Sequence, residues 1–262
     1  MFQPVLISSG LAGWQFLQST YDRQSAAFNA SAEIKRDTDY FAANIASVQT
    51  AEELVSDRRL MTVALGAFGL QDDIDNRFFI QKMLEEGTTA DDAIANRFAD
   101  SRYRQLSEAF GLGPGEIRGS LLPGFAEDII ERFQTASFEI AAGQQDETMR
   151  LALYAERIVP EVTGSAESEN QKWFSIMGQA PLRQVFETAL GLPSAFGQVD
   201  IDQQLEVFKE RADRVFGVSD PSEFADPEKL DQLITNYLAR AQLNASGAGA
   251  SGASIALSLL SR

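Results

Sequence analysis

Two Asp-x-Asp pairs are the part of this sequence best suited to holding a divalent cation. Carboxylate oxygens are ligands that calcium and magnesium prefer. A calcium-binding loop also needs a central glycine and a glutamate at its twelfth position, and in both pairs apolar residues occupy that space. We therefore favour helix capping, in which the carboxylates complement the positive end of the helix dipole, over metal binding. The residues concerned are Asp72, Asp73, Asp75, Asp200 and Asp202.

Paired glutamates at 52–53 and 85–86 could in principle provide general acid–base catalysis. In a chain with 38 aspartates and glutamates, such pairs are typical of solvated helix faces. The sequence contains no histidine and no cysteine, which removes imidazole bases, thiol nucleophiles and the usual zinc, copper and haem ligands. The glycine-rich segment 111–115 lacks the Gly-Lys-Ser/Thr ending of a phosphate-binding loop. We therefore predict no catalytic residue, no cofactor, no metal ligand and no enzymatic activity. The alternative is a carboxylate-based divalent-metal binder or an enzyme of unknown reaction.

Two adjacent arginines, Arg58 and Arg59, precede an apolar run that ends at glycines. Guanidinium groups can clamp the carboxylate of a partner in a bidentate geometry. They can also form ion pairs with local acids such as Glu52, Glu53 or Asp57, and we favour this structural role.

The charge balance of the chain is strongly acidic. Lysine and arginine total 22 against 38 acidic residues, which gives a formal net charge of −16. Such a surface repels nucleic acid phosphates and anionic lipid headgroups. No apolar run approaches the roughly 20 residues that a membrane-spanning helix needs. We therefore expect no nucleic acid partner, no membrane insertion and a cytoplasmic location.

Apolar residues recur at helical spacing along most of the chain, and we find no stretch that alternates as a strand would. Thr50 and Glu53 form the pattern of a capping box, which predicts a helix start. Asp226 followed by Pro227 predicts another, and Pro160 is expected to end the helix before it. The predicted fold class is all-α and multi-helical, with a flexible C-terminal tail.

Short motifs recur in the same order about 126 residues apart, and they predict two related helical modules joined by long helices. The tripeptide Ala-Leu-Gly at 64–66, for example, returns at 189–191. Whether the modules are a true duplication stays open, because amphipathic helices resemble one another readily. Residues 111–124 hold five glycines and two prolines and are a candidate hinge. The expected segments are an N-terminal helical arm at 1–49, module 1 at 50–112, a loop with connecting helices at 113–165, module 2 at 166–244 and a flexible tail at 245–262.

An apolar stripe near the N-terminus is the best candidate for a partner-binding surface. One helical face carries Leu11, Trp14, Leu17 and Tyr21. The more common role of such a stripe is packing within the chain. We single it out because a terminal helix outside the repeated modules can dock on a partner or exchange between copies.

Several motifs resemble an uncharacterised alphaproteobacterial family. They are Gly10-Leu-Ala-Gly-Trp14, Thr50-Ala-Glu-Glu-Leu54, Asp57-Arg-Arg-Leu60, the run from Val63 to Leu70, Phe98-Ala-Asp100, and Arg102-Tyr103 with Ala109-Phe110-Gly111. The family is known as a domain of unknown function, and some members occur in flagellar gene clusters. The resemblance implies a soluble bacterial protein and suggests a role in motility, but it transfers no catalytic residue.

Together these observations favour a non-enzymatic helical protein-interaction or assembly protein, linked to the bacterial flagellum if the resemblance extends that far. We expect a protein partner, whose identity the sequence does not indicate, and leave homo-oligomerisation open. If the protein is associated with the flagellum, we expect that it can also be exported from the cytoplasm by a route other than the Sec pathway.

Overall fold

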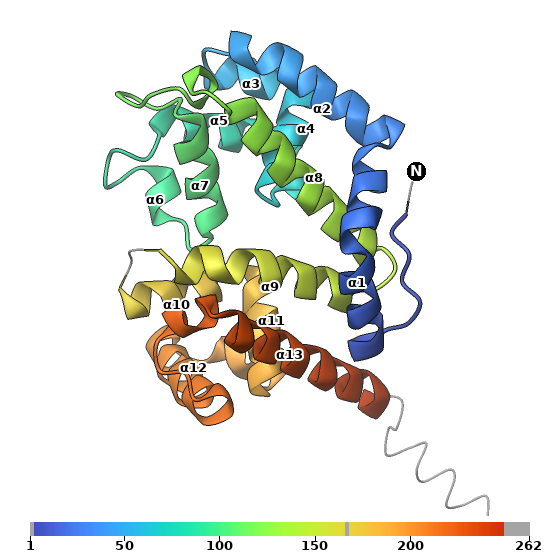
Figure 1. The fold of residues 1–262 in the computed structure, drawn as a ribbon. Coiled ribbons are helices and arrows are strands. Elements are labelled where there is room, and N and C mark those ends of the chain that lie inside the picture. Colours follow the sequence, from blue (N-terminus) through green and yellow to red (C-terminus); the bar gives the residue numbers. More distant parts are fainter. Residues whose placement is uncertain (1–2, 166–167, 249–262) are drawn as a thin grey trace, which may run out of the picture. The chain divides into compact units, whose positions relative to one another are not determined.

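The structure is a computed structural model that describes residues 3–165 and 168–248 (Figure 1). Across these residues the regular structure consists of α-helices and short 3₁₀ helices, without a strand. The prediction of an all-α fold is therefore confirmed. Most of the tail expected at 245–262 lies outside the described residues.

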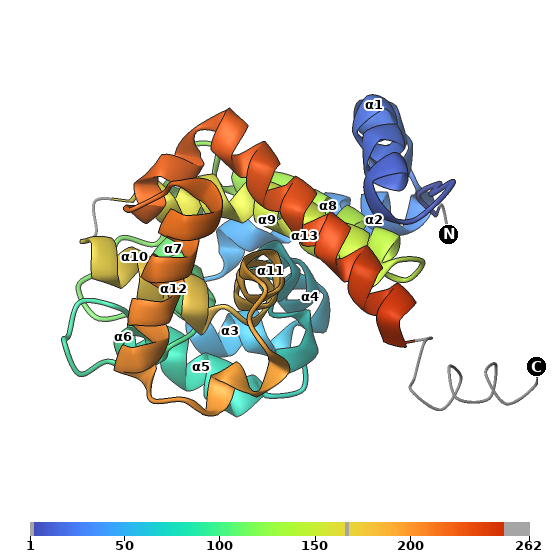
Figure 2. The same ribbon diagram turned by 90° about the horizontal axis from the view of Figure 1, so that it is seen from below.

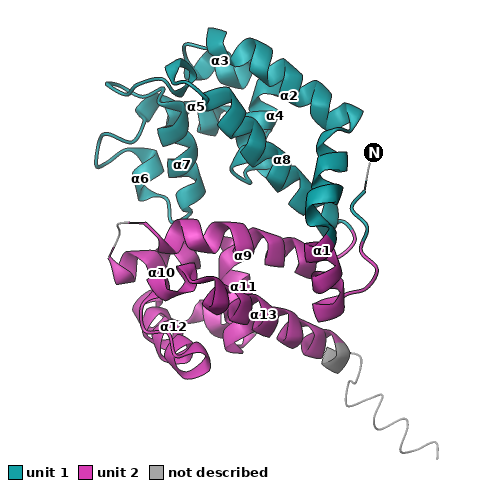
Figure 3. Cartoon of the chain, viewed as in Figure 1, with its two compact units in different colours: residues 1–5, 20–144 teal, residues 6–19, 145–262 magenta. Residues whose placement is uncertain are grey.

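The helices group into two compact units (Figure 3). Unit 1 comprises residues 1–5 and 20–144, and unit 2 comprises residues 6–19 and 145–262. Helix α1 (Gly10–Asn29) contributes residues to both units. The segment 113–165, expected to connect two modules, is instead divided between the units, because its two long helices are packing elements of the units themselves.

Unit 1 is organised around α4, which packs against α2, α3 and α8 (Figure 1). Helix α5 packs against α3, α6 and α7. The elements of the unit after α1 are α2 (Ala32–Asn44), η1 (Ile45–Ser47), α3 (Ala51–Ser56), α4 (Arg58–Ala67), η2 (Gln71–Asp73), α5 (Arg77–Glu86), α6 (Ile94–Arg97), α7 (Ser101–Phe110), η3 (Gly119–Leu121) and α8 (Phe125–Gly143).

Gly66 permits the close approach of α4 and α8. This glycine lies inside α4 and is buried. A Cβ atom at Gly66 would lie 2.7 Å from Cδ2 of Phe133 on α8. Because protein interiors are close-packed, that space is available only to a residue without a side chain.

Unit 2 is built around α11, which packs against α9, α10, α12 and α13 and is seen nearly end-on in Figure 2. Its core is aromatic: the Trp173 ring lies 6.0 Å from the rings of both Phe186 and Phe208. The elements are α9 (Glu147–Thr163), α10 (Glu169–Gly178), α11 (Ala180–Leu190), η4 (Ser194–Gln198), α12 (Ile201–Phe216), η5 (Pro221–Ala225) and α13 (Pro227–Ala248).

Two helix ends differ from the sequence-based expectation. Pro160 does not end α9, which continues to Thr163. A proline removes its own N–H donor and crowds the carbonyl four residues earlier, but the residues beyond it can still form helical bonds, as the 2.9 Å bond from the Gly164 N–H to the Pro160 carbonyl shows. Helix α13 continues to Ala248, into the segment expected to be a linker. Alanine is the strongest helix former, and extending an established helix is favourable.

The loop at 111–124 lies within unit 1 and does not separate the units, so the hinge prediction is wrong. Glu116 holds the loop in place. Its carboxylate accepts hydrogen bonds from the backbone N–H of Thr88 at 2.6 Å, from the Thr88 hydroxyl at 2.8 Å and from the Gly113 N–H at 3.1 Å.

Each unit contains the same junction between a short helix and the helix that follows it. Asp57 ends α3 and begins α4 with φ −94° and ψ 102°, and Gln179 joins α10 to α11 with φ −93° and ψ 107°. A tyrosine from the preceding long helix reaches each junction side chain. Tyr40 Oη donates to Asp57 Oδ2 at 2.6 Å, and Tyr154 Oη donates to Gln179 Oε1 at 2.8 Å.

The helices after the two junctions also end alike. Gly69 and Gly191 both have positive φ, +69° and +68°, and each lies twelve residues beyond its junction. Each follows a Schellman arrangement, with Leu70 N–H bonded to Leu65 O and Leu192 N–H to Glu187 O. The junction residues and the helix-ending glycines of the two units are thus each 122 residues apart, whereas the two Ala-Leu-Gly tripeptides are 125 residues apart. That match pairs Gly66, in a helix interior, with a C-terminal glycine and is wrong as a structural alignment.

Candidate interaction surfaces

The predicted partner-binding stripe on α1 packs largely inside the chain. Trp14 is 5% exposed and Leu17 is fully buried, while Leu11 and Tyr21 are half-buried. The Tyr21 ring makes an edge-on contact with Phe138 at 5.2 Å between centroids. These residues therefore pack within the chain, which is the more common role of such a stripe. Partner binding through them stays a prediction.

Arg58 and Arg59 both engage local groups, as the favoured interpretation expected, but their partners differ from those proposed. Arg58 Nη1 lies 2.8 Å from Asp75 Oδ1, and both side chains are largely exposed. Arg59 Nη2 lies 4.0 Å from Asp37 Oδ1. Glu53 is not available to either arginine, because its carboxylate accepts from the Gln49 and Thr50 N–H groups in the capping box of α3.

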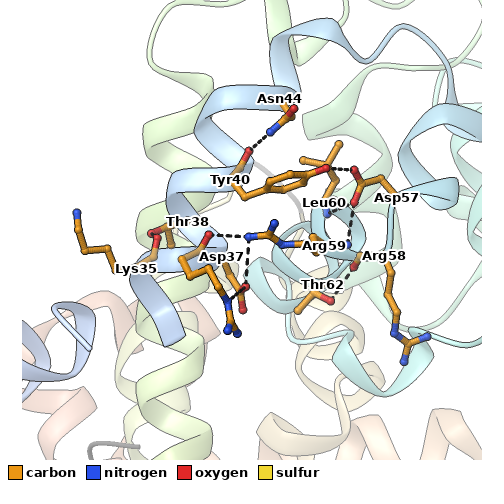
Figure 4. A network of polar contacts seen from close by, with 11 residues as sticks. Lys35, Asp37, Thr38, Tyr40, Asn44, Asp57, Arg58, Arg59, Leu60 and Thr62 are labelled. Atoms are coloured by element: carbon orange, nitrogen blue, oxygen red, sulfur yellow. Dashed lines mark hydrogen bonds and ion pairs between the residues drawn. The ribbon is translucent and has the colours of Figure 1, made fainter. Parts of the chain in front are cut away.

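Two contacts with α2 hold the Arg59 side chain in place. Its guanidinium carbon lies 3.8 Å from the centre of the Tyr40 ring, in a cation–π contact. Its Nη2 donates to the backbone carbonyl of Arg36 at 3.0 Å. Figure 4 shows the Arg59 side chain beneath the Tyr40 ring, with Arg58 extending away from it.

Asp57 is the polar centre of this network. Its Oδ1 accepts from the backbone N–H groups of Arg59 at 2.9 Å and Leu60 at 3.2 Å, and thereby caps α4 (Figure 4). Burial alone would raise the pKa of Asp57, but the hydrogen bonds from Tyr40 and from these two N–H groups hold it below its usual value. The bond to Asp57 in turn raises the pKa of Tyr40. The carboxylate is therefore ionised at neutral pH.

A shallow depression of about 580 Å³ lies beside this network, between α2 and α4. Three cationic side chains and one carboxylate line it together with Tyr40. The lining residues are Ala32, Lys35, Arg36, Asp39, Tyr40 and Arg59.

The two Asp-x-Asp pairs are used in different ways. Asp200 caps α12 by accepting from the Asp202 N–H at 3.0 Å, which confirms the capping prediction at this position. The first pair does not cap a helix. Asp73 accepts from Tyr103 Oη at 2.6 Å and from Asn76 Nδ2 at 2.7 Å, while Asp75 pairs with an arginine. Over residues 3–165 and 168–248, no group of three or more acidic side chains could hold a metal ion.

An aromatic cluster formed by α5, α7 and the residue that follows α6 is the surface that sequence reasoning missed. The rings of Phe79, Phe98 and Tyr103 contact one another with centroids 5.3 to 5.6 Å apart. Phe98 is 44% exposed, and Phe78, next to Phe79 on α5, is 79% exposed. We call Phe78, Phe79, Phe98 and Tyr103 the aromatic patch. A signal existed, because two adjacent phenylalanines on a helix cannot both face the same core.

The patch rests on a rigid support. Tyr103 is half-buried, and burial together with its bond to Asp73 raises its pKa well above the usual value. Asp100 caps α7 and holds Arg102 in an ion pair of 2.6 Å, and Arg102 Nη1 donates to the Gly69 carbonyl at 2.5 Å. Polar contacts thus tie the start of α7, which carries Tyr103, to Gly69 beyond the end of α4.

None of the helices in the described part of the chain has the length and hydropathy to cross a membrane. No curated protein matches the sequence. A solved structure with a similar fold is that of protein AGR_C_984 from Agrobacterium tumefaciens, with a TM-score of 0.76 and 24% sequence identity. The alignment covers 92% of this chain and 97% of that one, and at this identity it shows the fold alone.

A family match supports the resemblance noted in the sequence. Residues 67–230 match the family described as "Protein of unknown function (DUF1217)". The matched segment contains the whole aromatic patch and does not contain the stripe on α1. The match spans more than half of the chain, so the protein belongs to the DUF1217 family.

Proposed function

We propose that this protein is a non-enzymatic helical interaction protein that docks a partner protein through the aromatic patch of unit 1. The observation that carries the proposal is the exposure of two phenylalanines of unit 1, Phe78 at 79% and Phe98 at 44%. Leaving a phenylalanine in water forgoes about 1.5–3 kcal/mol of burial free energy. Large apolar side chains that stay exposed on one unit are candidates for an interaction site.

The chemistry of the patch supports a protein partner. Aromatic residues are enriched in the cores of protein interfaces, where they fill apolar pockets. The net charge of −16 disfavours nucleic acid and anionic membrane surfaces as the occupant. Arg77 and Arg97 adjoin the two exposed phenylalanines in sequence and are themselves exposed. A partner with apolar side chains flanked by carboxylates would complement both features.

A non-enzymatic role is supported by the composition. The sequence offers no histidine or cysteine for catalysis, and the local bonds of Asp73, Asp75 and Asp200 commit these carboxylates to structure. The flagellar role rests on the resemblance alone. A strain that lacks the gene should swim poorly in soft agar if the role is correct, whereas normal swimming would remove it.

Co-purification from the native cell tests the docking proposal. The double variant Phe78→Ser/Phe98→Ser should lose the protein captured by the wild-type chain, with little loss of stability, because both side chains are exposed. Phe174→Ser is the matched control, since Phe174 is a partly exposed phenylalanine of unit 2, at 37%. Equal capture by wild type and the double variant would contradict the proposal.

A further inference from the structure

We propose that the depression between α2 and α4 is a binding site for an acidic peptide segment, whose carboxylates are held by Arg59 and Arg36. This site lies on residues 32–59 and is separate from the aromatic patch, so the inference does not rest on the proposed docking surface. The inference gives a role to charged residues near Tyr40 that are not needed to hold the junction between α3 and α4 at Asp57.

The second junction shows which features the fold needs. There Tyr154 bonds to Gln179, which is 1% exposed, so a neutral acceptor suffices to hold the tyrosine. When the two tyrosines are aligned, the positions of Lys35 and Asp37 correspond to Met149 and Leu151, which are buried and apolar. When the two junctions are aligned, Arg59 corresponds to Pro181. Lys35, Asp37 and Arg59 are thus additions to a shared structural frame. Arg36 is not, because the tyrosine alignment pairs it with Arg150.

The two arginines are positioned to share one carboxylate. Asp37 Oδ1 lies 3.5 Å from Arg36 Nε and 4.0 Å from Arg59 Nη2. Strong bonds between guanidinium and carboxylate are shorter, at about 2.7–2.9 Å. In the described part of the chain, therefore, Asp37 satisfies neither guanidinium fully. An incoming carboxylate could make the short, bidentate contact that Asp37 does not make.

Arg59 is also fixed before any ligand arrives. It is 44% exposed, yet its guanidinium is stacked on the Tyr40 ring and bonded to a carbonyl. Fixing a long side chain in advance lowers the entropy cost of binding. Asp57 does not compete for this guanidinium, because its two oxygens accept from Tyr40 and from the backbone of α4.

The form of the site favours a short segment over a large polyanion. The depression is open, and Lys35, which is 65% exposed and lies 3.5 Å from Asp39 Oδ2, adds a third cation to its lining. The rest of the chain is acidic enough to repel an extended phosphate backbone. A flexible peptide with a few carboxylates fits both the cationic lining of the open depression and the acidic surface around it.

Fluorescence anisotropy with a labelled peptide tests the inference. The probe is the acetylated and amidated tetrapeptide Gly-Asp-Glu-Gly, titrated with the full chain at low ionic strength, and its Asn/Gln counterpart is the neutral probe. Arg59→Gln should weaken binding of the acidic peptide about tenfold, the usual effect of losing a charge-assisted bond. Arg58→Gln is the matched control, because Arg58 pairs with Asp75 away from the depression, and should bind within twofold of wild type.

A second variant keeps the test valid if Arg59→Gln disturbs folding. Arg36→Gln changes a side chain that is 68% exposed and should also weaken binding without affecting thermal stability. Equal losses for Arg58→Gln and Arg59→Gln, or equal binding of the neutral probe, would overturn the inference. So would complete displacement of the peptide by an equal concentration of inorganic phosphate, which would assign the site to phosphate groups.

Discussion

Tyr40 on α2 donates a 2.6 Å hydrogen bond to Asp57, the single residue at which α3 ends and α4 begins. The bond ties the N-terminus of the central helix of unit 1 to the helix beside it. The equivalent bond from Tyr154 to Gln179 lies in the interior of unit 2. Comparing the two bonds separates the contacts that both units share from the charged groups that surround Tyr40 in unit 1.

Removing the two tyrosine hydroxyls should have unequal effects. Tyr154→Phe should lower the free energy of unfolding by about 1–3 kcal/mol, because its bond to Gln179 is buried. Tyr40→Phe should lower the free energy of unfolding less than Tyr154→Phe does, because its bond is accessible to water. Urea denaturation of both variants measures the difference. A larger loss for Tyr40→Phe would contradict the burial argument.

Asp57→Ala should destabilise unit 1 in a pH-dependent way. The variant loses both the helix cap and the acceptor for Tyr40, which should cost about 1–2 kcal/mol at pH 7. The folded-state pKa of Asp57 is lowered, so its contribution is present above the unfolded value of about 4 and is lost as the pH falls through the folded value. Thermal denaturation of wild type and variant from pH 7 to pH 3 should show the gap closing at the acid end. A gap independent of pH would show that ionised Asp57 contributes nothing.

Gly66→Ala should destabilise the protein even though alanine favours helices. The gain in propensity is about 1 kcal/mol, whereas the added Cβ would meet Phe133 at 2.7 Å and force α4 and α8 apart, at about 1–3 kcal/mol. Phe133→Leu should be less harmful in the Gly66→Ala background than in the wild type. Additive effects in this double-mutant cycle would contradict the steric explanation.

Divalent cations should leave the protein unchanged. Three aspartates of the two Asp-x-Asp pairs are engaged: Asp200 in a helix cap, Asp73 in side-chain bonds and Asp75 in an ion pair. Differential scanning fluorimetry with millimolar calcium or magnesium should therefore show no shift in the melting temperature. A saturable increase, abolished by Asp73→Asn or by Asp200→Asn, would instead favour the metal-binding alternative.

The helical class was predictable because local patterns decide it. The capping box at Thr50 and Glu53 forms as expected, since both of its bonds lie within four residues. Pro160 was misread because the consequence of a proline depends on its distance from the helix end, which tertiary packing sets. The Ala-Leu-Gly match failed because only the backbone conformation distinguishes Gly66, inside a helix, from Gly191, at a left-handed helix end.

The candidate surfaces were less predictable, because exposure is a property of the assembled fold. Leu17 and Phe78 are both apolar residues at helical positions, yet Leu17 is fully buried and Phe78 is 79% exposed. Periodicity identifies an apolar face but does not tell whether another element covers it. The partners of Arg58 and Arg59 were missed for the same reason, since Asp75 and Asp37 approach them from other elements of unit 1.

Site-specific photo-crosslinking in the native cell tests the central claim most directly. A photoreactive phenylalanine analogue at position 78 should yield a discrete covalent adduct with a partner protein. The same analogue at Phe174, on α10 of unit 2, should yield none. An adduct at position 78 that disappears when Phe98 is changed to serine would support docking at the aromatic patch. Absence of an adduct at position 78 would contradict it.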